Sequence, residues 1–206
     1  MTPAAPTIHI VDDDASFRTS MSRLLQASGY QTALYESGDA FLKQLPADEV
    51  GCILLDLQMS GVNGFELQEQ LAGKGNALPI IFLTAHGDIR AGVHAIKAGA
   101  EDFLAKPVSR EALADCVERA LAHNVERRLH KDRVNGMRRL VASLTPREAE
   151  VFALVVRGKL SKQIAHELGT TVRTIKAHRH AVMDKLGVKS FAEAVSIAER
   201  LGMLGE

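Results

Sequence analysis

An apolar run ends abruptly in a single carboxylate in the segment Cys52-Ile53-Leu54-Leu55-Asp56-Leu57-Gln58-Met59, around which the rest of the chain is organised. The turn-forming residues 60–64, Ser-Gly-Val-Asn-Gly, follow directly. A short apolar run bounded by turn residues is typical of a strand buried in a parallel sheet. Asp56 then lies at the carboxyl end of a central strand, where open α/β sheets place their sites. Taken alone, this carboxylate is compatible with a metal ligand, a nucleophile or a helix N-cap.

The surrounding sequence alternates between short β-rich runs and amphipathic helical segments. Strands are predicted over residues 7–11, 32–35, 52–56, 79–84 and 102–105. Helices are predicted after the N-caps Asp14 and Ser37, over 64–72 and 88–98, and from Ser109 onward. Five such alternations imply an α/β fold of the flavodoxin-like kind, in which helices cover both faces of a doubly wound parallel sheet. The last helix is expected to continue into a linker, because no glycine or proline interrupts it before Gly136; its mixed charges favour a solvated helix over a short coiled coil.

Length and composition limit the class of protein. The chain has 206 residues, and no apolar run approaches the ~20 residues that span a bilayer, so no membrane association is expected. The two cysteines, Cys52 and Cys116, lack metal-binding spacing and fit a reducing cytoplasm. Residues 1–122 carry nine basic and sixteen acidic side chains, whereas residues 123–206 carry sixteen and nine. Net charges of −7 and +7 favour an acidic domain joined to one that binds a polyanion.

Polar side chains stand where four of the predicted strands end. Asp12 and Asp13 follow the first strand, and Asp56 ends the third. Thr84 ends the fourth strand and Lys106 follows the fifth. Because the carboxyl ends of parallel strands share one edge, these side chains are expected to converge there. Crowded carboxylates need a cation, and hard oxygen ligands suit Mg²⁺. Because a hydroxyl and an ammonium are expected beside the carboxylates, the cluster predicts a site that binds a phosphoryl group.

These motifs together resemble the receiver domain of two-component response regulators over about residues 6–122. The resemblance is carried by Val11-Asp12-Asp13-Asp14, Leu55-Asp56-Leu57-Gln58-Met59, Leu83-Thr84-Ala85, Lys97-Ala98-Gly99-Ala100 and Asp102-Phe103-Leu104-Ala105-Lys106-Pro107. It implies that Asp56 accepts a phosphoryl group from a sensor histidine kinase. It also implies a Mg²⁺ site formed by Asp12, Asp13, Asp56 and the backbone carbonyl of Gln58.

Further roles follow from the same resemblance. Thr84 and Phe103 are expected to form a switch pair, and a cis peptide bond is expected before Pro107. The two residues expected to border the phosphoryl group and tune its hydrolysis are Gln58 and His86. Ser60 departs from the family, which commonly has proline at this place, so the loop is expected to be looser here.

The C-terminal third has a different pattern, in which glycines separate short helices. Thr145 and Glu148 form a capping box that opens the first of them. Ser161 is expected to cap a short second helix, and a third helix is predicted over residues 172–186. A last helix follows Ser190. Two helices joined by a short glycine turn are typical of a helix-turn-helix unit.

The third helix carries a basic face that begins near its N-terminus, as in recognition helices that enter the major groove of DNA. This region resembles the LuxR-type DNA-binding domain over about residues 142–203. The matching motifs are Leu144-Thr145-Pro146-Arg147-Glu148, Ser161-Lys162-Gln163-Ile164-Ala165, Thr174-Ile175-Lys176-Ala177-His178-Arg179 and Val182-Met183-Asp184-Lys185-Leu186-Gly187-Val188. The expected DNA contacts are Lys162, Thr171, Arg173, Thr174, Lys176, Ala177, Arg179 and His180.

Together the two resemblances place the chain in the NarL/FixJ family, close to the FixJ type. They imply a receiver domain at 1–122, a helical linker at 123–141 and a helix-turn-helix domain at 142–206. The expected protein is a cytoplasmic regulator and not an enzyme, apart from phosphotransfer and dephosphorylation on itself. Phosphorylation is expected to switch homodimerisation and binding to promoter DNA, with activation of transcription and RNA polymerase as a further partner.

Two other functions remain open at this point. A hydrolase of the haloacid-dehalogenase kind would use Asp56 as nucleophile, although its usual second aspartate is replaced by Gln58. A constitutive nucleic-acid binder would use the first domain only as a phosphate sink. DNA affinity measured with and without acetyl phosphate separates the second of these from a phosphorylation-controlled regulator.

Overall fold

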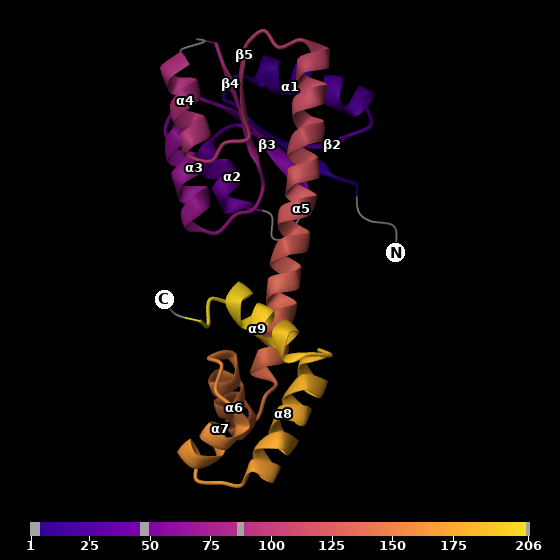
Figure 1. Cartoon of the computed structure of the whole chain (residues 1–206). Coiled ribbons are helices and arrows are strands. Elements are labelled where there is room, and N and C mark those ends of the chain that lie inside the picture. The colour runs from indigo at the N-terminus through magenta and orange to yellow at the C-terminus, as the bar shows by residue number, and fades with distance from the viewer. Residues whose placement is uncertain (1–4, 46–49, 86–88, 205–206) are drawn as a thin grey trace. The chain divides into compact units, whose positions relative to one another are not determined.

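A computed structural model describes residues 5–45, 50–85 and 89–204 of the chain. The chain forms two compact units, Met1–Arg128 and Leu129–Glu206, whose elements are labelled in Figure 1. The division falls inside the segment predicted as a linker. Among the described residues, no helix is both long enough and apolar enough to cross a membrane.

The first unit is built on a five-stranded parallel sheet with the strand order β2-β1-β3-β4-β5. The strands are β1 (Thr7–Val11), β2 (Gln31–Tyr35), β3 (Gly51–Asp56), β4 (Ile80–Thr84) and β5 (Asp102–Ala105). The helices are α1 (Ala15–Ala27), α2 (Gly38–Lys43), α3 (Gly64–Gly73), α4 (Ile89–Lys97) and α5 (Arg110–Ala142). This arrangement confirms the predicted α/β fold and places β3 at the centre of the sheet.

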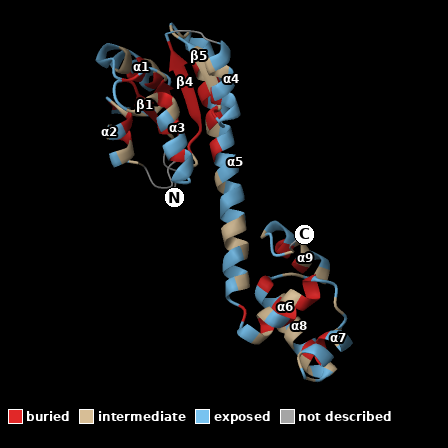
Figure 2. Cartoon of the chain, turned by 90° about the vertical axis from the view of Figure 1, so that its left-hand side faces the viewer, coloured by how far each residue is buried: buried red, intermediate tan, exposed pale blue. Residues whose placement is uncertain are grey.

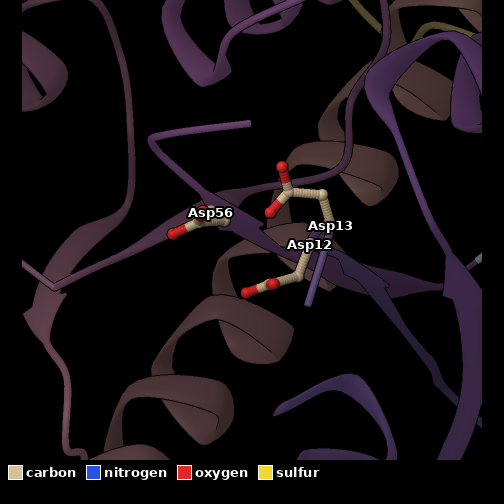
Figure 3. A group of neighbouring side chains, drawn as sticks. All are labelled: Asp12, Asp13 and Asp56. Carbon is tan, nitrogen blue, oxygen red and sulfur yellow. The ribbon is translucent and has the colours of Figure 1, made fainter. Parts of the chain in front are cut away.

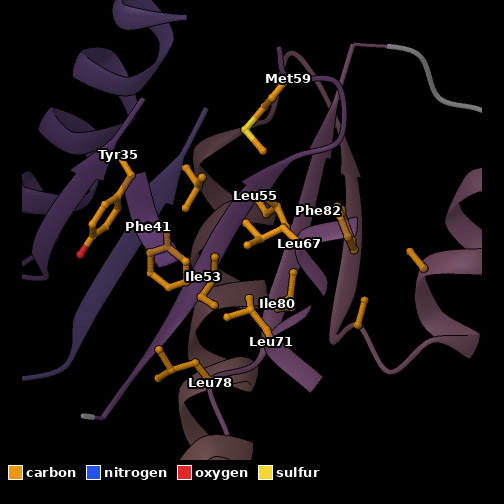
Figure 4. Packing of buried hydrophobic residues seen from close by; sticks show 13 residues of the cluster. Tyr35, Phe41, Ile53, Leu55, Met59, Leu67, Leu71, Leu78, Ile80 and Phe82 are labelled. Carbon is orange, nitrogen blue, oxygen red and sulfur yellow. The ribbon is translucent and has the colours of Figure 1, made fainter. Parts of the chain in front are cut away.

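Two apolar cores cover the two faces of the sheet. In β3 every residue is buried, with Ile53 and Leu55 in one core and Cys52 and Leu54 in the other. The first core packs side chains of α2, α3 and α4 against the sheet (Figure 4), and the second packs α1 and α5. Every residue of β4 is buried as well, as the colour of this strand in Figure 2 shows. Burial on both faces explains why the sequence of β3 is continuously apolar instead of alternating.

Local sequence signals set where the helices begin. The side chain of Asp14 accepts the backbone N–H groups of Ser16 and Phe17 at the start of α1. Asn63 and Glu66 form a capping box at the start of α3. Each cap supplies acceptors for N–H groups that have no partner within the helix.

Helix α5 runs on into the linker, as predicted, and its 33 residues continue past Gly136, where the uninterrupted spacing ended. Its fully buried Asn124 fixes it to the sheet. The side-chain oxygen of Asn124 accepts the N–H of Gly51 at 3.3 Å, and its amide nitrogen donates to the carbonyl of Ala77 at 3.1 Å. Helix α5 is thereby bound to the starting point of the central strand.

The second unit is helical and comprises α6 (Pro146–Val156), α7 (Ser161–Glu167), α8 (Val172–Leu186) and α9 (Phe191–Arg200). Phe152, Val182 and Ala194 contribute to a core shared by α6, α8 and α9, and a second core joins α6, α7 and α8. Gly187 ends α8 in the left-handed conformation, with φ of 66°, as a glycine cap should.

The predicted cap of α7 was wrong. Ser161 is the first residue of the helix, and the N-cap position is Leu160, whose N–H donates to the side-chain oxygen of Gln163 at 2.8 Å. The hydroxyl of Ser161 instead accepts a hydrogen bond at 3.0 Å from the guanidinium of Arg179 in α8. The Ser161 side chain, which the local sequence predicted as a helix cap, therefore bonds to another helix instead.

Candidate functional site

Three carboxylates come together at the carboxyl ends of β1 and β3, which are neighbours in the sheet. One oxygen from each of Asp12, Asp13 and Asp56 lies within 4.8 Å of the others. Figure 3 shows the three side chains side by side at this edge. Asp12 and Asp56 are buried, whereas Asp13 is exposed. The structure thus brings together the carboxylates that the strand pattern singled out.

Lys106, which follows β5, reaches into the same cluster. Its ammonium nitrogen lies 2.6 Å from Oδ2 of Asp12 and 2.9 Å from Oδ1 of Asp56. The same nitrogen stands 4.0 Å from the centre of the Phe17 ring, and the peptide bond to Pro107 is cis. Burial alone would lower the pKa of Lys106, but the bonds to the two carboxylates outweigh it and raise this pKa above its ordinary value. The lysine is therefore held charged between them.

The electrostatics of Asp56 favour a further cation. Burial raises the pKa of this carboxyl above its ordinary value, and the bond to Lys106 opposes that shift without cancelling it. Two neighbouring carboxylates raise the pKa further. Because one ammonium faces three carboxylates, the cluster keeps a negative charge that a divalent cation with oxygen ligands would neutralise. The donor set consequently fits a hard cation and could hold a metal ion.

Asp13 is held from the loop that follows β3. Its Oδ2 accepts the backbone N–H of Ser60 at 3.0 Å and the hydroxyl of Ser60 at 2.8 Å. These hydrogen bonds lower the pKa of Asp13. The expectation of a looser loop is therefore not met at Ser60, because two bonds tie it to the acidic cluster. Gln58 lies exposed in the same loop, and His86 lies outside the described residues.

Thr84 and Phe103 lie on the neighbouring strands β4 and β5, where Thr84 pairs with Ala105 and Phe103 pairs with Phe82. Thr84 ends β4 and is buried, and its carbonyl accepts the N–H of Lys106 at 2.6 Å. Phe103 is half-buried on β5, and its ring lies against α4, where a methyl group added at Gly92 would come within 3.2 Å of it. The ring therefore packs on the α4 side of the sheet.

In the second unit, the N-terminal half of α8 carries most of the residues predicted to contact DNA. Thr171 caps the helix: its hydroxyl accepts the N–H of Thr174 at 3.1 Å and lies 2.9 Å from the hydroxyl of Thr174. These two hydroxyls thus bond to each other at the helix start. The predicted contact residues that lie exposed are Lys162, Thr171, Arg173, Lys176, Ala177 and His180.

Arg179 is placed differently from this exposed set. Its guanidinium lies 3.8 Å from the centre of the Phe191 ring, at the start of α9, besides donating to Ser161. Lys176, His180 and Met183 line the same hollow. Arg179 therefore joins α7, α8 and α9 and is less available to a base edge than its sequence spacing suggested. The contact of Arg179 with Phe191 was not predicted, because Phe191 is an ordinary apolar residue after a helix cap in the sequence.

Glu148 fixes α8 against α6. One of its carboxylate oxygens accepts the N–H of Thr145 at 2.8 Å and the ammonium of Lys185 at 2.6 Å. These bonds, with that to Lys185 the strongest influence, lower the pKa of Glu148 from 4.5 to about 2. The capping box predicted at the start of α6 is thus also the anchor of the basic helix.

The pKa of Glu148 predicts how acid affects the second unit. A carboxyl whose pKa falls on folding adds stability above its unfolded pKa of 4.5, and this contribution is lost as pH falls towards about 2. Glu148→Gln is therefore expected to lower the urea midpoint for unfolding of α6–α9 at pH 7, with the difference shrinking below pH 4.5. Hydrogen-exchange mass spectrometry on the full chain measures the unfolding of this unit separately from that of the first unit. The exposed Glu199→Gln is the control, and a pH-independent difference would contradict the assignment.

A doubly wound sheet with an acidic cluster and a lysine at its carboxyl edge, joined to a unit with a basic helix, is the arrangement that the sequence predicted for a regulator of the two-component class. Comparison with known proteins agrees. Residues 8–118 match the family described as the response regulator receiver domain, and residues 142–198 match bacterial regulatory proteins of the luxR family. The chain therefore belongs to the response regulator family and carries a LuxR-type DNA-binding domain.

Individual relatives match both units. The response regulator protein TodT of Pseudomonas putida is 38% identical over 98% of this chain and 88% of its own length. The transcriptional regulatory protein FixJ of Bradyrhizobium diazoefficiens is 36% identical over 97% of each chain. The solved structure of the response regulator StyR is 43% identical, with a TM-score of 0.82, and covers 96% of this chain and all of its own.

This family membership gives the function in outline. The chain is a two-component response regulator, with a sensor kinase as partner and DNA as the ligand of its second domain, and it regulates transcription. The hydrolase alternative leaves the LuxR-family match of residues 142–198 without a role.

Proposed function

We propose that Asp56 is the phosphoacceptor and that its phosphorylation switches the chain into a DNA-binding homodimer that activates transcription. The observation that carries this proposal is the convergence of Asp12, Asp56 and Lys106 at one edge of the sheet. The chain would act in the cytoplasm, where its DNA and the kinase's phosphohistidine are found, and would contact RNA polymerase at the promoter. It would catalyse no reaction beyond phosphotransfer to, and hydrolysis from, its own aspartate.

The chemistry assigned to each residue follows from its position. Lys106 bonds Oδ1 of Asp56, so the other carboxylate oxygen attacks the phosphorus of the donor while the bond to the leaving group breaks. The ammonium neutralises charge that develops on the phosphoryl oxygens. Asp12, Asp13 and the carbonyl of Gln58 would hold Mg²⁺, which supplies further charge neutralisation when bound. Thr84 follows Leu83, which pairs with Asp56 between β3 and β4, and its hydroxyl would donate to the phosphoryl group.

The proposed output is a change at the α4 face. Thr84 would turn towards the phosphoryl group and Phe103 would move inward from its position against Gly92. This movement would reshape a surface that already exposes apolar side chains: Ile89 is 82% exposed, Val93 49% and Ile96 47%. Two such surfaces, brought together in a dimer, would be covered from water, which is the driving force for association. Such a switch is a two-state equilibrium biased by the new charge contacts.

The test compares DNA affinity and oligomeric state of the full chain before and after treatment with acetyl phosphate and Mg²⁺. Phosphorylation is expected to produce a dimer in sedimentation velocity and to tighten binding to a selected duplex. The duplex is obtained by selection from a random pool with the phosphorylated chain. Equal affinity and an unchanged monomer after confirmed phosphorylation would support the constitutive binder instead.

The exposed lysines of α7 and α8 are expected to have different roles on DNA. Lys162, at the start of α7, is better placed to contact DNA phosphates. Lys176 lies four residues before His180 on α8, so the two side chains share one face of the helix. Lys162→Ala is expected to weaken binding to every duplex and to lower the salt slope by about one. Lys176→Ala is expected to cost ~1–3 kcal/mol mainly on the selected duplex.

The measurement is a fluorescence-anisotropy titration of both variants on the selected duplex and on a random one, at several salt concentrations. Lys189→Ala, an exposed lysine between α8 and α9, is the matched control. If Lys176→Ala lowers both affinities equally, Lys176 contacts phosphate and the reading face of α8 is rotated from this assignment.

A further inference from the structure

We infer that Ser60 is a positioning residue for the metal site, because it holds the Asp13 carboxylate in place for a divalent cation. This inference rests on the proposed function, since it assigns part of the same site. The observation is a pair of hydrogen bonds to one oxygen, Oδ2 of Asp13, from the hydroxyl of Ser60 at 2.8 Å and from its backbone N–H at 3.0 Å. The two residues are 47 positions apart, so the pairing is a product of the fold.

The need for such a partner follows from the surroundings of Asp13. Asp12 and Asp56 are buried, and Lys106 bonds both of them. Asp13 is exposed, and the two hydrogen bonds that its Oδ2 accepts come from Ser60. An exposed carboxylate loses rotamer freedom when it binds a metal, which costs free energy. Donors that already fix the carboxylate reduce this cost, as partners of metal ligands generally do.

The loop after β3 is shaped to deliver these donors. Gly61 has φ of 82°, a left-handed conformation that turns the chain immediately after Ser60. Asn63 then caps α3, which fixes the far end of the loop. Ser60 is therefore presented to Asp13 by a turn with defined ends, and the backbone N–H would remain in place if only the hydroxyl were removed. A proline at position 60 would remove both donors, because it has neither an N–H nor a hydroxyl.

The test measures Mg²⁺ affinity of the full, unphosphorylated chain by isothermal titration calorimetry. Ser60→Pro is expected to weaken Mg²⁺ binding by about tenfold, the range found for partners of metal ligands. Ser60→Ala, which keeps the N–H, is expected to give a smaller loss. Ser60→Thr keeps both donors and is expected to restore the affinity of the unchanged chain.

A double-mutant cycle separates positioning from a general effect on the loop. In an Asp13→Ala background, Ser60→Ala is expected to cause no further loss of Mg²⁺ affinity, because its acceptor is gone. The unfolding midpoint in EDTA is expected to be the same for Ser60→Ala and the unchanged chain. Unchanged or tighter Mg²⁺ binding in Ser60→Ala, or an equal loss in both backgrounds, would overturn the inference.

The result also distinguishes this inference from the proposed function. If phosphoryl uptake at Asp56 requires Mg²⁺ but the Mg²⁺ affinity does not change when Ser60 is substituted, the proposed function is supported and the inference about Ser60 is wrong. If the unchanged chain binds no Mg²⁺, both fall together.

Discussion

Asp56→Asn is expected to abolish phosphoryl uptake from acetyl phosphate and from a sensor kinase. An amide oxygen is a far poorer nucleophile than a carboxylate oxygen, while the size and shape of the side chain are almost unchanged. The variant should therefore fold normally and still accept a hydrogen bond from Lys106. Intact-protein mass spectrometry after treatment with acetyl phosphate measures the uptake directly.

Asp115→Asn is the matched control for this experiment. It makes the same chemical change at an exposed aspartate on α5, and uptake should equal that of the unchanged chain. Phosphate retained on Asp56→Asn at full stoichiometry would place the acceptor at another residue and remove the basis of the proposed function.

Gly51→Ala is expected to destabilise the first unit by about 3 kcal/mol or more, because the added methyl has no room. A Cβ atom at position 51 would lie 2.1 Å from the carbonyl oxygen of Thr7, on the neighbouring strand β1. The obstacle is backbone, so relief requires separation of the two strands that carry Asp12 and Asp56. The urea midpoint of the first unit, followed in the full chain by hydrogen exchange, measures the loss.

Gly73→Ala tests whether this loss is specific. Gly73 ends α3, and among the described residues no group beyond its chain neighbours and its own helix lies within 4 Å of a Cβ atom built there. Alanine is the better helix former, so this substitution should leave the midpoint unchanged or raise it slightly. A normal midpoint for Gly51→Ala would mean that β1 and β3 shift to admit the methyl.

Most of the sheet was predictable because its residues have one dominant requirement, burial between two layers of helices. The run at 52–56 shows this requirement directly. The predicted boundaries differ by a residue where a backbone detail intervenes: β4 begins at Ile80, although Pro79 already accepts the N–H of Ile53 through its carbonyl at 2.9 Å. Proline has no N–H to give to the ladder, so the regular pairing starts one residue later.

The acidic cluster and Lys106 were predictable for a topological reason, since each follows a strand of one parallel sheet. The bonds of Ser60 to Asp13 and of Arg179 to Ser161 were not. They depend on which way a loop turns and on which rotamer a long side chain adopts, and neither is fixed by spacing along the chain. In the sequence, Ser60 stood out only as a departure from the family pattern, and a looser loop was expected instead of the two bonds to Asp13.

The lysine bridge also sets when the acidic cluster is completed during folding. Lys106 bonds residues that lie 94 and 50 positions earlier in the chain, Asp12 and Asp56. Contacts of such long range form only after the intervening loops have closed, so they belong to the slow part of folding. A chain emerging from the ribosome carries Asp56 well before it carries Lys106. If Asp56 accepts the phosphoryl group as proposed, an unfinished receiver therefore has the aspartate but not the lysine that would neutralise the incoming charge.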